Sequence, residues 1–430
     1  MIKYSIFILY ILLLGCSFDT KSGIWTEEKK ISELNKNISE VFKKKEIIQK
    51  EFNSKLLIKI NDNPKNHSDE LKNKIGIKDF EEKLNKSSRF RFSKINNFAH
   101  FEPELTFDGE NFIFFDHKGN LIKFNDNFDI IWKKNFYSNQ EKKLSPILTL
   151  SNDKNFLVVV DNISKVYVVD LKLGNLVWSK YNQNPFNSQV KIFDNKIFAV
   201  DINNVLRCFS LIDGTEIWRF NSENTFLKSS KRNSLVINNG IVYFNNSIGD
   251  IVAVDIDKGS LIWQTPTQTS AIYENAFGLV MSDLVINKES LMFSNNLNEF
   301  YSINLKNGVI NWKQKINSSV RPAFYNDQIF TVSNEGYFFV IDSKTGNILR
   351  ITDIFNFFKI KNRNKINPVG FVVGKTKILL STNNGRLIKI DIEKGTVDLI
   401  SKIDNEKISR PFVFNKKIIL LKDNSIIRLN

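Results

Sequence analysis

One short pattern of residues recurs along most of this chain. Its clearest copy is Asp255, Gly259 and Trp263, which follow the alternating run Ile251 to Val254. The same spacing returns at Asp170, Gly174 and Trp178; at Ser210, Gly214 and Trp218; at Asn304, Gly308 and Trp312; at Asp342, Gly346 and Arg350; and at Asp391, Gly395 and Leu399. The interval between copies is roughly forty residues, which is the period of propeller and solenoid repeats. The chain is therefore predicted to be a repeat protein.

Each part of the pattern has a physical reason. Apolar residues at every second position, such as Ile251 and Ala253, indicate β-strands with one face against a neighbouring sheet. The Asp, Asn or Ser that follows can accept hydrogen bonds from turn amides, and the glycine adopts a positive φ at little cost. The tryptophan then lies on the next strand, where a large ring packs between sheets. We interpret these residues as turn and packing residues, not as a carboxylate ring or a sugar-binding platform, and four strands per copy match a propeller blade.

The number of blades follows from the two ends of the repeat region. A shorter first copy ends at Trp132, and an eighth copy, Asn424 to Asn430, stops where the others have their turn. An open sheet edge invites aggregation, so another segment should supply the missing strand. We predict that Arg89 to Ser93 closes the ring, with Phe90 or Phe92 in the place of the tryptophan. The fold class is thus all-β, an eight-bladed β-propeller over residues 89–430.

The first residues are typical of an export signal. An apolar run from Ile6 to Leu14 is too short to span a bilayer, and it leads into Leu13-Leu14-Gly15-Cys16. These four residues resemble the lipobox of bacterial lipoproteins, which implies a signal peptide at residues 1–15 and modification of Cys16 with diacylglycerol and palmitate. The residue after the cysteine is Ser17 and not aspartate, which implies a lipid-anchored protein on the periplasmic face of the outer membrane. The alternative is an uncleaved anchor with an incidental thiol.

Residues 16–88 are predicted to be a lipidated, charged and helical tether. Apolar residues at helical spacing from Ile31 to Phe52 indicate an amphipathic helix, and Glu70 to Leu84 indicate a second, short helix. Such helices either dock on a partner or an anionic membrane, or pack weakly on the propeller. The second interpretation is favoured.

Composition narrows the partners and the chemistry. The net charge of +15 suits nucleic acid, an anionic membrane or an acidic protein, but export removes nucleic acid from consideration. With Cys16 acylated, an internal disulfide is impossible, and the apolar neighbours of Cys208 predict a core residue. His67, His100 and His117 have no second histidine or cysteine at metal-ligand spacing, and nucleophile-elbow, zincin and nucleotide-loop motifs are absent. We therefore predict no enzyme, no metal and no cofactor.

The repeat resembles the A-x-D-x-x-x-G-x-x-x-W blade motif of quinoprotein dehydrogenases and of the BamB family of outer-membrane assembly lipoproteins. Ala253 and Asp255 with Gly259 and Trp263 form the clearest instance, and the likeness extends over residues 89–430. The quinoproteins hold pyrroloquinoline quinone with an adjacent pair of cysteines and with calcium ligands. This chain has no adjacent cysteines, so the BamB family is the better match.

This resemblance implies a non-catalytic scaffold subunit of the outer-membrane β-barrel assembly machinery. Such a subunit binds the barrel protein BamA and other assembly subunits and aids the insertion of unfolded outer-membrane proteins. In the family this contact uses a leucine and a basic residue in a loop leading into a middle blade, which correspond by position to Leu227 and Lys228, beside Phe226. A second contact uses an acidic residue of the next inter-blade loop, for which Asp283 is the candidate.

Two other functions stay open at this stage. A periplasmic quinone-dependent dehydrogenase would bind calcium and the quinone in the central funnel. A cell-wall or carbohydrate-binding lipoprotein would expose aromatic residues on one face of the propeller. Bound cofactor would distinguish the first from a scaffold, and the placement of the aromatic side chains would distinguish the second.

Overall fold

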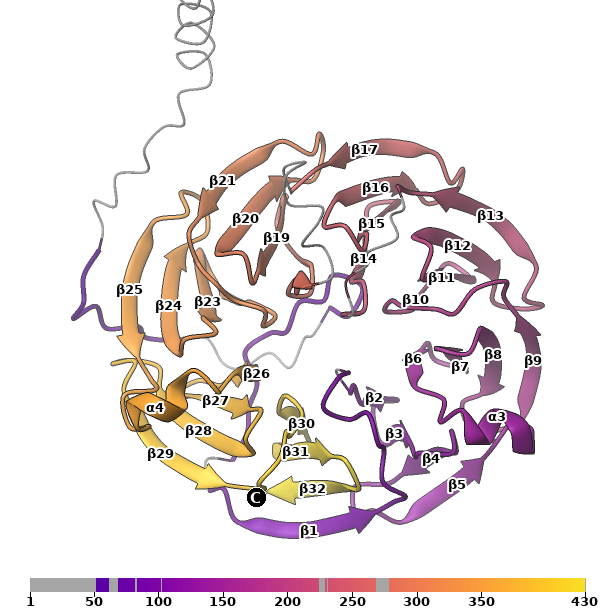
Figure 1. Cartoon of the computed structure of the whole chain (residues 1–430), viewed down its shortest axis with the longest axis horizontal. Helices are drawn as coiled ribbons and strands as arrows, with labels where there is room; N and C mark the ends of the chain where they lie inside the picture. Colours follow the sequence, from indigo (N-terminus) through magenta and orange to yellow (C-terminus); the bar gives the residue numbers. More distant parts are fainter. Residues whose placement is uncertain are drawn as a thin grey trace, which may run out of the picture. The chain divides into compact units, whose positions relative to one another are not determined.

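The computed structural model describes residues 52–61, 69–81, 83–101, 103–223, 229, 231–267 and 278–429. The chain divides into two compact units, Met1–Ile48 and Gln49–Asn430, and all described residues belong to the second. This unit is a ring of eight four-stranded antiparallel sheets (Figure 1), so the predicted eight-bladed β-propeller is confirmed. Among the described residues, no helix has both the length and the apolar character needed to cross a membrane.

Strands within each blade run from the axis outward in chain order, except in the last blade. Blades 1 to 4 consist of β2(Thr106–Phe107), β3(Phe112–Phe115), β4(Leu121–Phe124) and β5(Ile130–Lys134); β6(Leu148–Asn152), β7(Phe156–Asp161), β8(Lys165–Asp170) and β9(Leu176–Tyr181); β10(Lys191–Phe193), β11(Lys196–Val200), β12(Val205–Ser210) and β13(Glu216–Asn221); and β14(Leu235–Asn238), β15(Ile241–Asn245), β16(Ile251–Asp255) and β17(Leu261–Thr265).

Blades 5 to 8 consist of β18(Val285–Asn287), β19(Ser290–Asn295), β20(Glu299–Asn304) and β21(Ile310–Gln314); β22(Ala323–Tyr325), β23(Gln328–Val332), β24(Tyr337–Asp342) and β25(Ile348–Asp353); β26(Pro368–Val373), β27(Lys377–Thr382), β28(Arg386–Asp391) and β29(Val397–Lys402); and β30(Phe412–Phe414), β31(Lys417–Lys422), β32(Ser425–Leu429) and β1(Lys86–Arg91). Two short helices, α3(Asn139–Lys143) and α4(Ile360–Arg363), lie in connections between strands.

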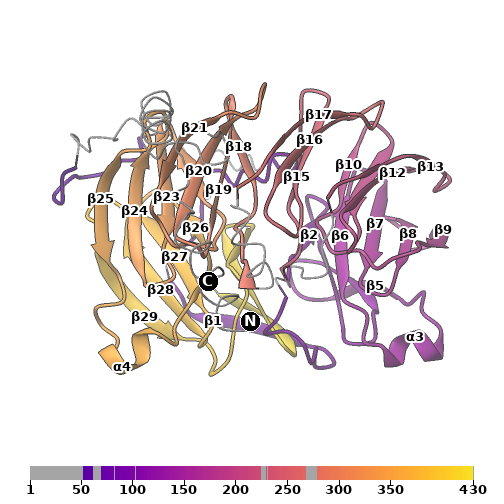
Figure 2. The same cartoon turned by 45° about the horizontal axis from the view of Figure 1, so that its top comes forward.

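The two middle strands of each blade form the core. Every residue of β8 except the last is buried, because each sheet is packed between two neighbouring sheets and both of its faces are covered. The tilted view in Figure 2 shows these sheets standing face to face around the ring. The outer strands are half exposed, as in β9, where residues alternate between exposed and partly buried. Cys208, predicted to be a core residue, is fully buried in β12, and burial raises the pKa of its thiol to about 12.

The tryptophans join neighbouring blades, as predicted. The Trp218 indole donates from Nε1 to the carbonyl oxygen of Ile256 in the next blade at 3.1 Å. Its ring also covers Gly259, where a Cβ atom would lie 2.6 Å from Trp218 Cδ2 and where φ is +66°. The indoles of Trp132, Trp178, Trp263 and Trp312 make the same contacts with the next blade. Only glycine fits under the ring at this positive φ, which explains its recurrence.

The repeated Asp residues are turn residues, also as predicted. Oδ1 of Asp255 accepts hydrogen bonds from the amides of Asp257 at 3.0 Å and Lys258 at 2.8 Å. Equivalent bonds from turn amides reach Asp170, Asp342 and Asp391. Each carboxylate therefore accepts hydrogen bonds from the backbone amides of the outer hairpin turn in its own blade.

The two ends of the chain close the ring. Strand β1 pairs antiparallel with β32, with Arg89 opposite Ile427 (Figure 1), so the predicted closure is confirmed. The prediction that a phenylalanine takes the tryptophan place was wrong, because the register sets Ser88 opposite Arg428, at the position where blades 1 to 5 have tryptophan. Phe90 instead packs against Phe124 of blade 1, with ring centroids 4.5 Å apart.

Two segments before β1 pack on the ring. Residues 52–61, here called the rim strap, bury Ile58 and Ile60 against blades 6 and 7. Residues 69–81, here called the axial strap, cross the middle of the ring (Figure 1). The short helix predicted at Glu70 to Leu84 was wrong, because the described residues of this stretch form a turn and then an extended segment held by hydrogen bonds to the propeller. The helix predicted from Ile31 lies outside the described residues, apart from its last position.

Candidate functional site

The eight blades present one equivalent position to the propeller axis. In each blade, the first strand pairs with the second in the same register, as Thr106 pairs with Ile113 in blade 1 and Phe412 with Ile419 in blade 8. The residue two positions before this first-strand residue is therefore equivalent in all blades. Around the ring these residues are Glu104, Thr149, Gln189, Ser234, Asp283, Arg321, Gly370 and Arg410. The short connections into these strands thus place charged residues from four different blades near the axis.

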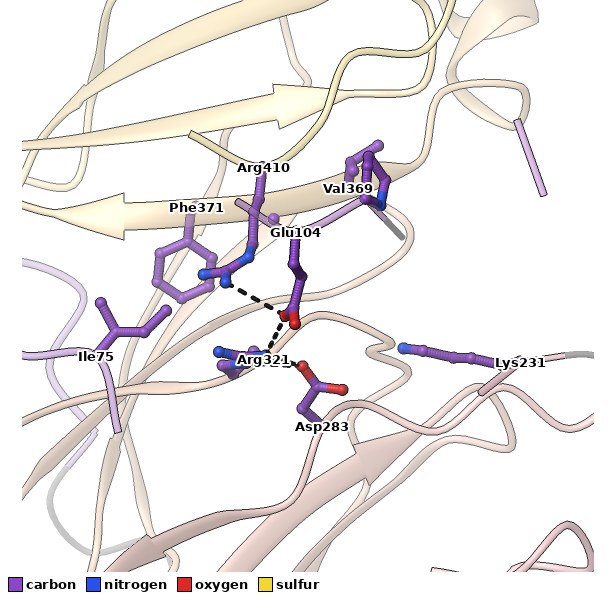
Figure 3. A pocket seen from close by; sticks show the side chains of 10 residues that line it. Ile75, Glu104, Lys231, Asp283, Arg321, Val369, Phe371 and Arg410 are labelled. Atoms are coloured by element: carbon purple, nitrogen blue, oxygen red, sulfur yellow. Dashed lines mark hydrogen bonds and ion pairs between the residues drawn. The ribbon is translucent and has the colours of Figure 1, made fainter. Parts of the chain in front are cut away.

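Glu104 lies at the centre of a charged cluster. Its Oε1 accepts from Nη2 of Arg321 at 2.8 Å and from Nη2 of Arg410 at 3.3 Å. Nη2 of Arg232, two residues before the equivalent position in blade 4, lies 2.9 Å from the same oxygen. Figure 3 shows the side chains of Glu104, Arg321 and Arg410 pointing toward one another from separate elements. One carboxylate therefore links blades 1, 4, 6 and 8 across the axis.

Asp283 completes the cluster from blade 5. Its Oδ2 accepts from Nε of Arg321 at 2.8 Å and also from Nη2 of the same guanidinium (Figure 3). Two donors of one guanidinium thus converge on a single carboxylate oxygen, and such charge-assisted hydrogen bonds are stronger than those between neutral groups. The side chain of Asp283 is only 5% exposed. It is thus held inside the ring and not displayed on an outer loop.

The protonation states follow from this geometry. Burial opposes ionisation of Glu104, but the charges of Arg232, Arg321 and Arg410 outweigh it and hold its pKa well below the usual range. The pKa of Asp283 is about 2 for the same reason, with burial opposed by Arg321 and Arg232. Burial and the nearby charge of Arg321 lower the pKa of Arg410 to about 10. Both carboxylates are therefore ionised at neutral pH and the arginines remain charged.

This charged cluster separates two cavities on the axis. The larger, of about 670 Å³, is lined by Phe101, Leu148, Lys231 and Arg232 among others. The smaller, of about 310 Å³, lies on the side of the axial strap. Glu104 lines both cavities and also the space of about 20 Å³ between them. The charged side chains thus obstruct the central channel.

The axial strap covers the smaller cavity. Its backbone accepts hydrogen bonds from inner strands of two blades, with the carbonyl of Leu71 bonded to Ile237 N at 2.8 Å and that of Lys72 to Ile286 N at 3.1 Å. The side-chain amide of Asn73, 3% exposed, donates to Gln189 Oε1 at 2.8 Å and to the carbonyl of Leu284 at 3.0 Å. The strap is therefore an ordered part of the propeller.

The strap continues across the ring to the last two blades. Lys78 N donates to the carbonyl of Val373 at 2.8 Å, and Glu81 N donates to that of Lys416 at 2.8 Å. Lys416 also pairs with Asp79, with Nζ and Oδ2 2.9 Å apart. Hydrogen bonds along its length thus tie the strap to five blades.

The sequence-predicted site residues fall into two groups. Asp283 belongs to the axial cluster, and the partner contact predicted for it stays a prediction. Phe226, Leu227 and Lys228, together with the lipidation candidate Cys16, lie outside the described residues. Sequence reasoning missed the other members of the cluster, although a signal was present: proline adjoins the charged residue in Pro103-Glu104, Arg321-Pro322 and Arg410-Pro411.

The residues of the channel do not fit a quinoprotein cofactor. The two cysteines, Cys16 and Cys208, are far apart in the sequence, and Cys208 is buried within blade 3. No group of three or more acidic, histidine or cysteine side chains suited to a metal ion occurs among the described residues. The charged cluster obstructs the axis between the two cavities, and the axial strap covers one of them. We therefore derive no chemistry through such a cofactor.

The closed ring, its tryptophan-docked repeats and its obstructed axis define a β-propeller with quinoprotein-like repeats. The family model described as outer membrane protein assembly factor BamB matches residues 106–352. A BamB from Moranella endobia (strain PCIT) is 24% identical over 291 residues, which are 67% of this chain and 72% of that protein. The chain belongs to the BamB family.

Solved structures agree on the fold. The crystal structure of BamB from Moraxella catarrhalis matches with a TM-score of 0.63 at 14% identity, covering 81% of this chain and 99% of that one. A quinohemoprotein alcohol dehydrogenase from Comamonas testosteroni matches with a TM-score of 0.58 at 8% identity, covering 81% of this chain and 76% of that enzyme. At such identities these likenesses concern the architecture alone.

Proposed function

We propose that this protein is a non-catalytic scaffold subunit of the outer-membrane β-barrel assembly machinery, which binds a BamA-like barrel protein and aids the insertion of outer-membrane proteins. The observation that carries this proposal is the match of the BamB family over residues 106–352. The axis supports it, because the charged cluster around Glu104 ties four blades together and favours a rigid ring. A rigid ring presents its loops to a partner at little cost in conformational entropy.

The connection between β13 and β14 is the proposed contact. It contains Phe226, Leu227 and Lys228, an aromatic, an aliphatic and a basic residue in succession. Aromatic side chains are enriched at the centres of protein interfaces, so Phe226 would be the anchor, and the charge of Lys228 would favour an acidic partner surface. Asp283, the second candidate, would act less directly, since its carboxylate is bound to Arg321 inside the ring.

A lipid anchor at Cys16 would hold the scaffold at the periplasmic face of the outer membrane. A single acyl chain gives only reversible membrane binding, whereas several chains on one residue make a stable anchor. Labelling of the protein with a radioactive fatty acid, compared with the Cys16→Ser variant, tests this part of the proposal. Equal labelling of both proteins contradicts it.

Affinity purification from the protein's own envelope tests the partner. The full-length protein is solubilised in mild detergent, the co-purifying proteins are identified by mass spectrometry, and bound quinone is sought in the same sample. We expect a BamA-like barrel protein in stoichiometric amount. Stoichiometric quinone without such a partner would overturn the scaffold in favour of a dehydrogenase.

The loop is tested by the double variant Leu227→Asp with Lys228→Asp. A matched control is Ile212→Asp with Lys258→Asp, which places the same changes in exposed outer hairpins of blades 3 and 4. We expect the loop variant to lose at least about tenfold in partner affinity, equivalent to the loss of one interface anchor, while its melting temperature matches that of the control. Equal partner recovery with both variants removes this loop from the proposal.

A further inference from the structure

The cavity under the axial strap carries a large excess of positive charge. This space of about 310 Å³, here called the axial cavity, lies between the strap and the inner strands of blades 8, 1, 2 and 3. Its charged lining residues are Lys74, Lys78, Lys191, Arg321, Arg410 and Lys416 against Glu70 and Glu104. Two carboxylates outside the lining, Asp79 and Asp283, pair with Lys416 and Arg321, so the excess cations are the other lysines and Arg410. Such a concentration of cations in a walled space creates a strong positive potential, since low-dielectric walls focus the field.

The ammonium groups of two of these lysines rest on neutral oxygens. Nζ of Lys191, a residue that is 8% exposed, donates to the carbonyl oxygen of Glu70 and to Oδ1 of Asn73 at 2.7 Å. Nζ of Lys74 donates to Oδ1 of Asn287 at 2.8 Å. Neutral acceptors satisfy the hydrogen bonds of an ammonium but do not offset its charge. Lys191 is the buried one of the two, and the charges of Glu104, Glu70 and Asp283 act on it without direct contact from their carboxylates. An anion in direct contact with this ammonium would lower the cost of burying it.

Arg410 is also poorly compensated. Its contact with Glu104, at 3.3 Å, is the longest of the three that Oε1 of this carboxylate makes with guanidiniums. The guanidinium lies over the ring of Phe412, with 4.6 Å between Cζ and the ring centroid. Asp283 is engaged by Arg321, so two carboxylates share three arginines. The balance of charge at this end of the cavity is thus positive.

We propose that the axial cavity is a binding site for a phosphate-type oxyanion, held chiefly by Lys191 and Arg410. Guanidinium groups present paired N–H donors that match the oxygens of a phosphate, and an ammonium adds a compact point charge. Thr149 and Ser151 line the same cavity and bring hydroxyl donors. The volume is many times the roughly 10–15 Å³ that a single water molecule needs on the same measure, which leaves room for phosphate or diphosphate.

The pKa values of the lysines that line the cavity are consistent with an anion site. Burial, with the charge of Arg321, lowers the pKa of Lys191 to about 8, and burial lowers the pKa of Lys74 and Lys78. An anion bound beside Lys191 would raise this pKa again, because it stabilises the ammonium. Binding at a pH above 8 should therefore take up a proton.

A phosphate group could come to this cavity from two sources, a free anion or the headgroup of a phospholipid. Inorganic pyrophosphate is the probe for the first source. Vesicles of phosphatidylglycerol are the probe for the second. The site is the same in both cases, and Lys191 should matter equally for both.

The experiment uses calorimetric titration of the folded protein with pyrophosphate at low ionic strength, in buffers of different ionisation enthalpy. The Lys191→Met variant removes the charge at similar length, Lys78→Gln changes a second lining residue, and Lys258→Gln in an exposed hairpin is the control. We expect one site per chain, proton uptake above pH 8, and affinity weaker by at least about tenfold in Lys191→Met, as for loss of one charge-assisted contact. Lys258→Gln should bind as the unmodified chain does.

The outcomes are distinct. Vesicle binding that depends on Lys191 and that pyrophosphate displaces assigns the site to a lipid headgroup, and pyrophosphate binding without vesicle binding assigns it to the free anion. Binding that Lys191→Met and Lys78→Gln weaken no more than Lys258→Gln overturns the proposal, as does the absence of saturable binding to either probe. If Lys191→Met loses its near-ultraviolet dichroism, Lys78→Gln alone decides.

Discussion

The guanidinium of Arg350 donates from Nη2 to the carbonyl oxygen of Ile392 in the next blade at 3.0 Å. In blades 1 to 5 an indole makes this contact, as Trp312 does with the carbonyl of Ser343 at 3.1 Å. A Cβ on Gly395 would lie 2.9 Å from Nη2 of Arg350, as a Cβ on Gly346 would lie against the Trp312 ring. Arginine therefore keeps both functions of the missing tryptophan, since it is planar and carries N–H donors.

Arg350 also holds the rim strap. Its Nη1 donates to the carbonyl oxygens of Leu56 at 2.7 Å and Glu393 at 2.6 Å. An indole has one donor and cannot make these extra bonds. The replacement of tryptophan at this position thus couples the junction of blades 6 and 7 to the segment before the propeller.

We predict that Arg350→Ala and Arg350→Trp have different effects. Arg350→Ala leaves three carbonyl oxygens without this donor and should lower the free energy of unfolding by about 2–4 kcal/mol. Arg350→Trp should restore the bond to Ile392 and retain most of the stability, but release the rim strap. Urea unfolding measures the first effect, and hydrogen exchange of residues 52–61 measures the second. Unchanged exchange in both variants would show that Arg350 does not hold the strap.

The glycines under the tryptophans allow a prediction with an internal control. Gly259 and Gly240 have similar φ values, +66° and +74°, but only Gly259 lies under an indole. Gly240→Ala should cost about 1 kcal/mol, the conformational cost of a left-handed residue. Gly259→Ala should cost about 1–3 kcal/mol more, because the methyl group overlaps Trp218. Thermal unfolding compares the two, and equal losses would mean that the ring moves aside freely.

The sequence predicts the parts of the fold that each repeat determines locally. Asp255 and Gly259 lie in one hairpin turn, and Trp263 packs on the next blade. The spacing of such residues along the sequence therefore predicts the hairpins, the contacts between blades and the number of blades. The axial cluster depends on residues such as Glu104 and Arg410, which are far apart in the chain and meet only when the ring closes. No local spacing relates them.

The straps were missed for a different reason. Asn73 is buried, and its side-chain amide donates hydrogen bonds to four acceptors in blades 3, 4 and 5. The residues around it in the sequence are largely charged and do not indicate a core position. The sequence predicts a short helix at Glu70 to Leu84 instead. The tertiary hydrogen bonds of the extended strap outweigh that local preference.

Acid should weaken the ring through the axial cluster. The folded-state pKa values of Glu104 and Asp283 lie below those of unfolded carboxyls, about 4. Their contribution is complete above about pH 5 and is lost as the pH falls toward 2, because the unfolded chain then binds more protons. Glu104→Gln should remove part of this slope and lower stability at pH 7 by about 2–4 kcal/mol, since uncompensated guanidiniums remain.

Urea unfolding at a series of pH values measures this effect. Glu289→Gln, a change at an exposed carboxyl on blade 5, is the matched control and should leave both the slope and the stability at pH 7 unchanged. If Glu104→Gln has the acid slope of the unmodified chain, the cluster does not contribute to acid unfolding.

Strand β1 closes the ring, and we predict that its removal causes self-association. The pairing of β1 with β32 is reinforced outside the strands, where Phe92 N donates to the carbonyl of Asn424 at 3.0 Å and Ile95 N donates to that of Asp423 at 2.7 Å. A chain beginning at residue 94 would leave the outer edge of β32 unpaired. Unpaired edges template pairing with other chains, so this chain should self-associate, whereas a chain beginning at residue 84 should stay monomeric.

Light scattering after size-exclusion chromatography measures the association state of both chains. Because both lack the axial and rim straps, the difference between them isolates β1. A synthetic peptide of residues 84–94 should restore the monomer when it is added to the shorter chain, since it can occupy the open edge in the same antiparallel register. A monomeric shorter chain without peptide would mean that seven complete blades and a three-stranded eighth protect themselves, and that the N-terminal strand is not needed to shield the edge.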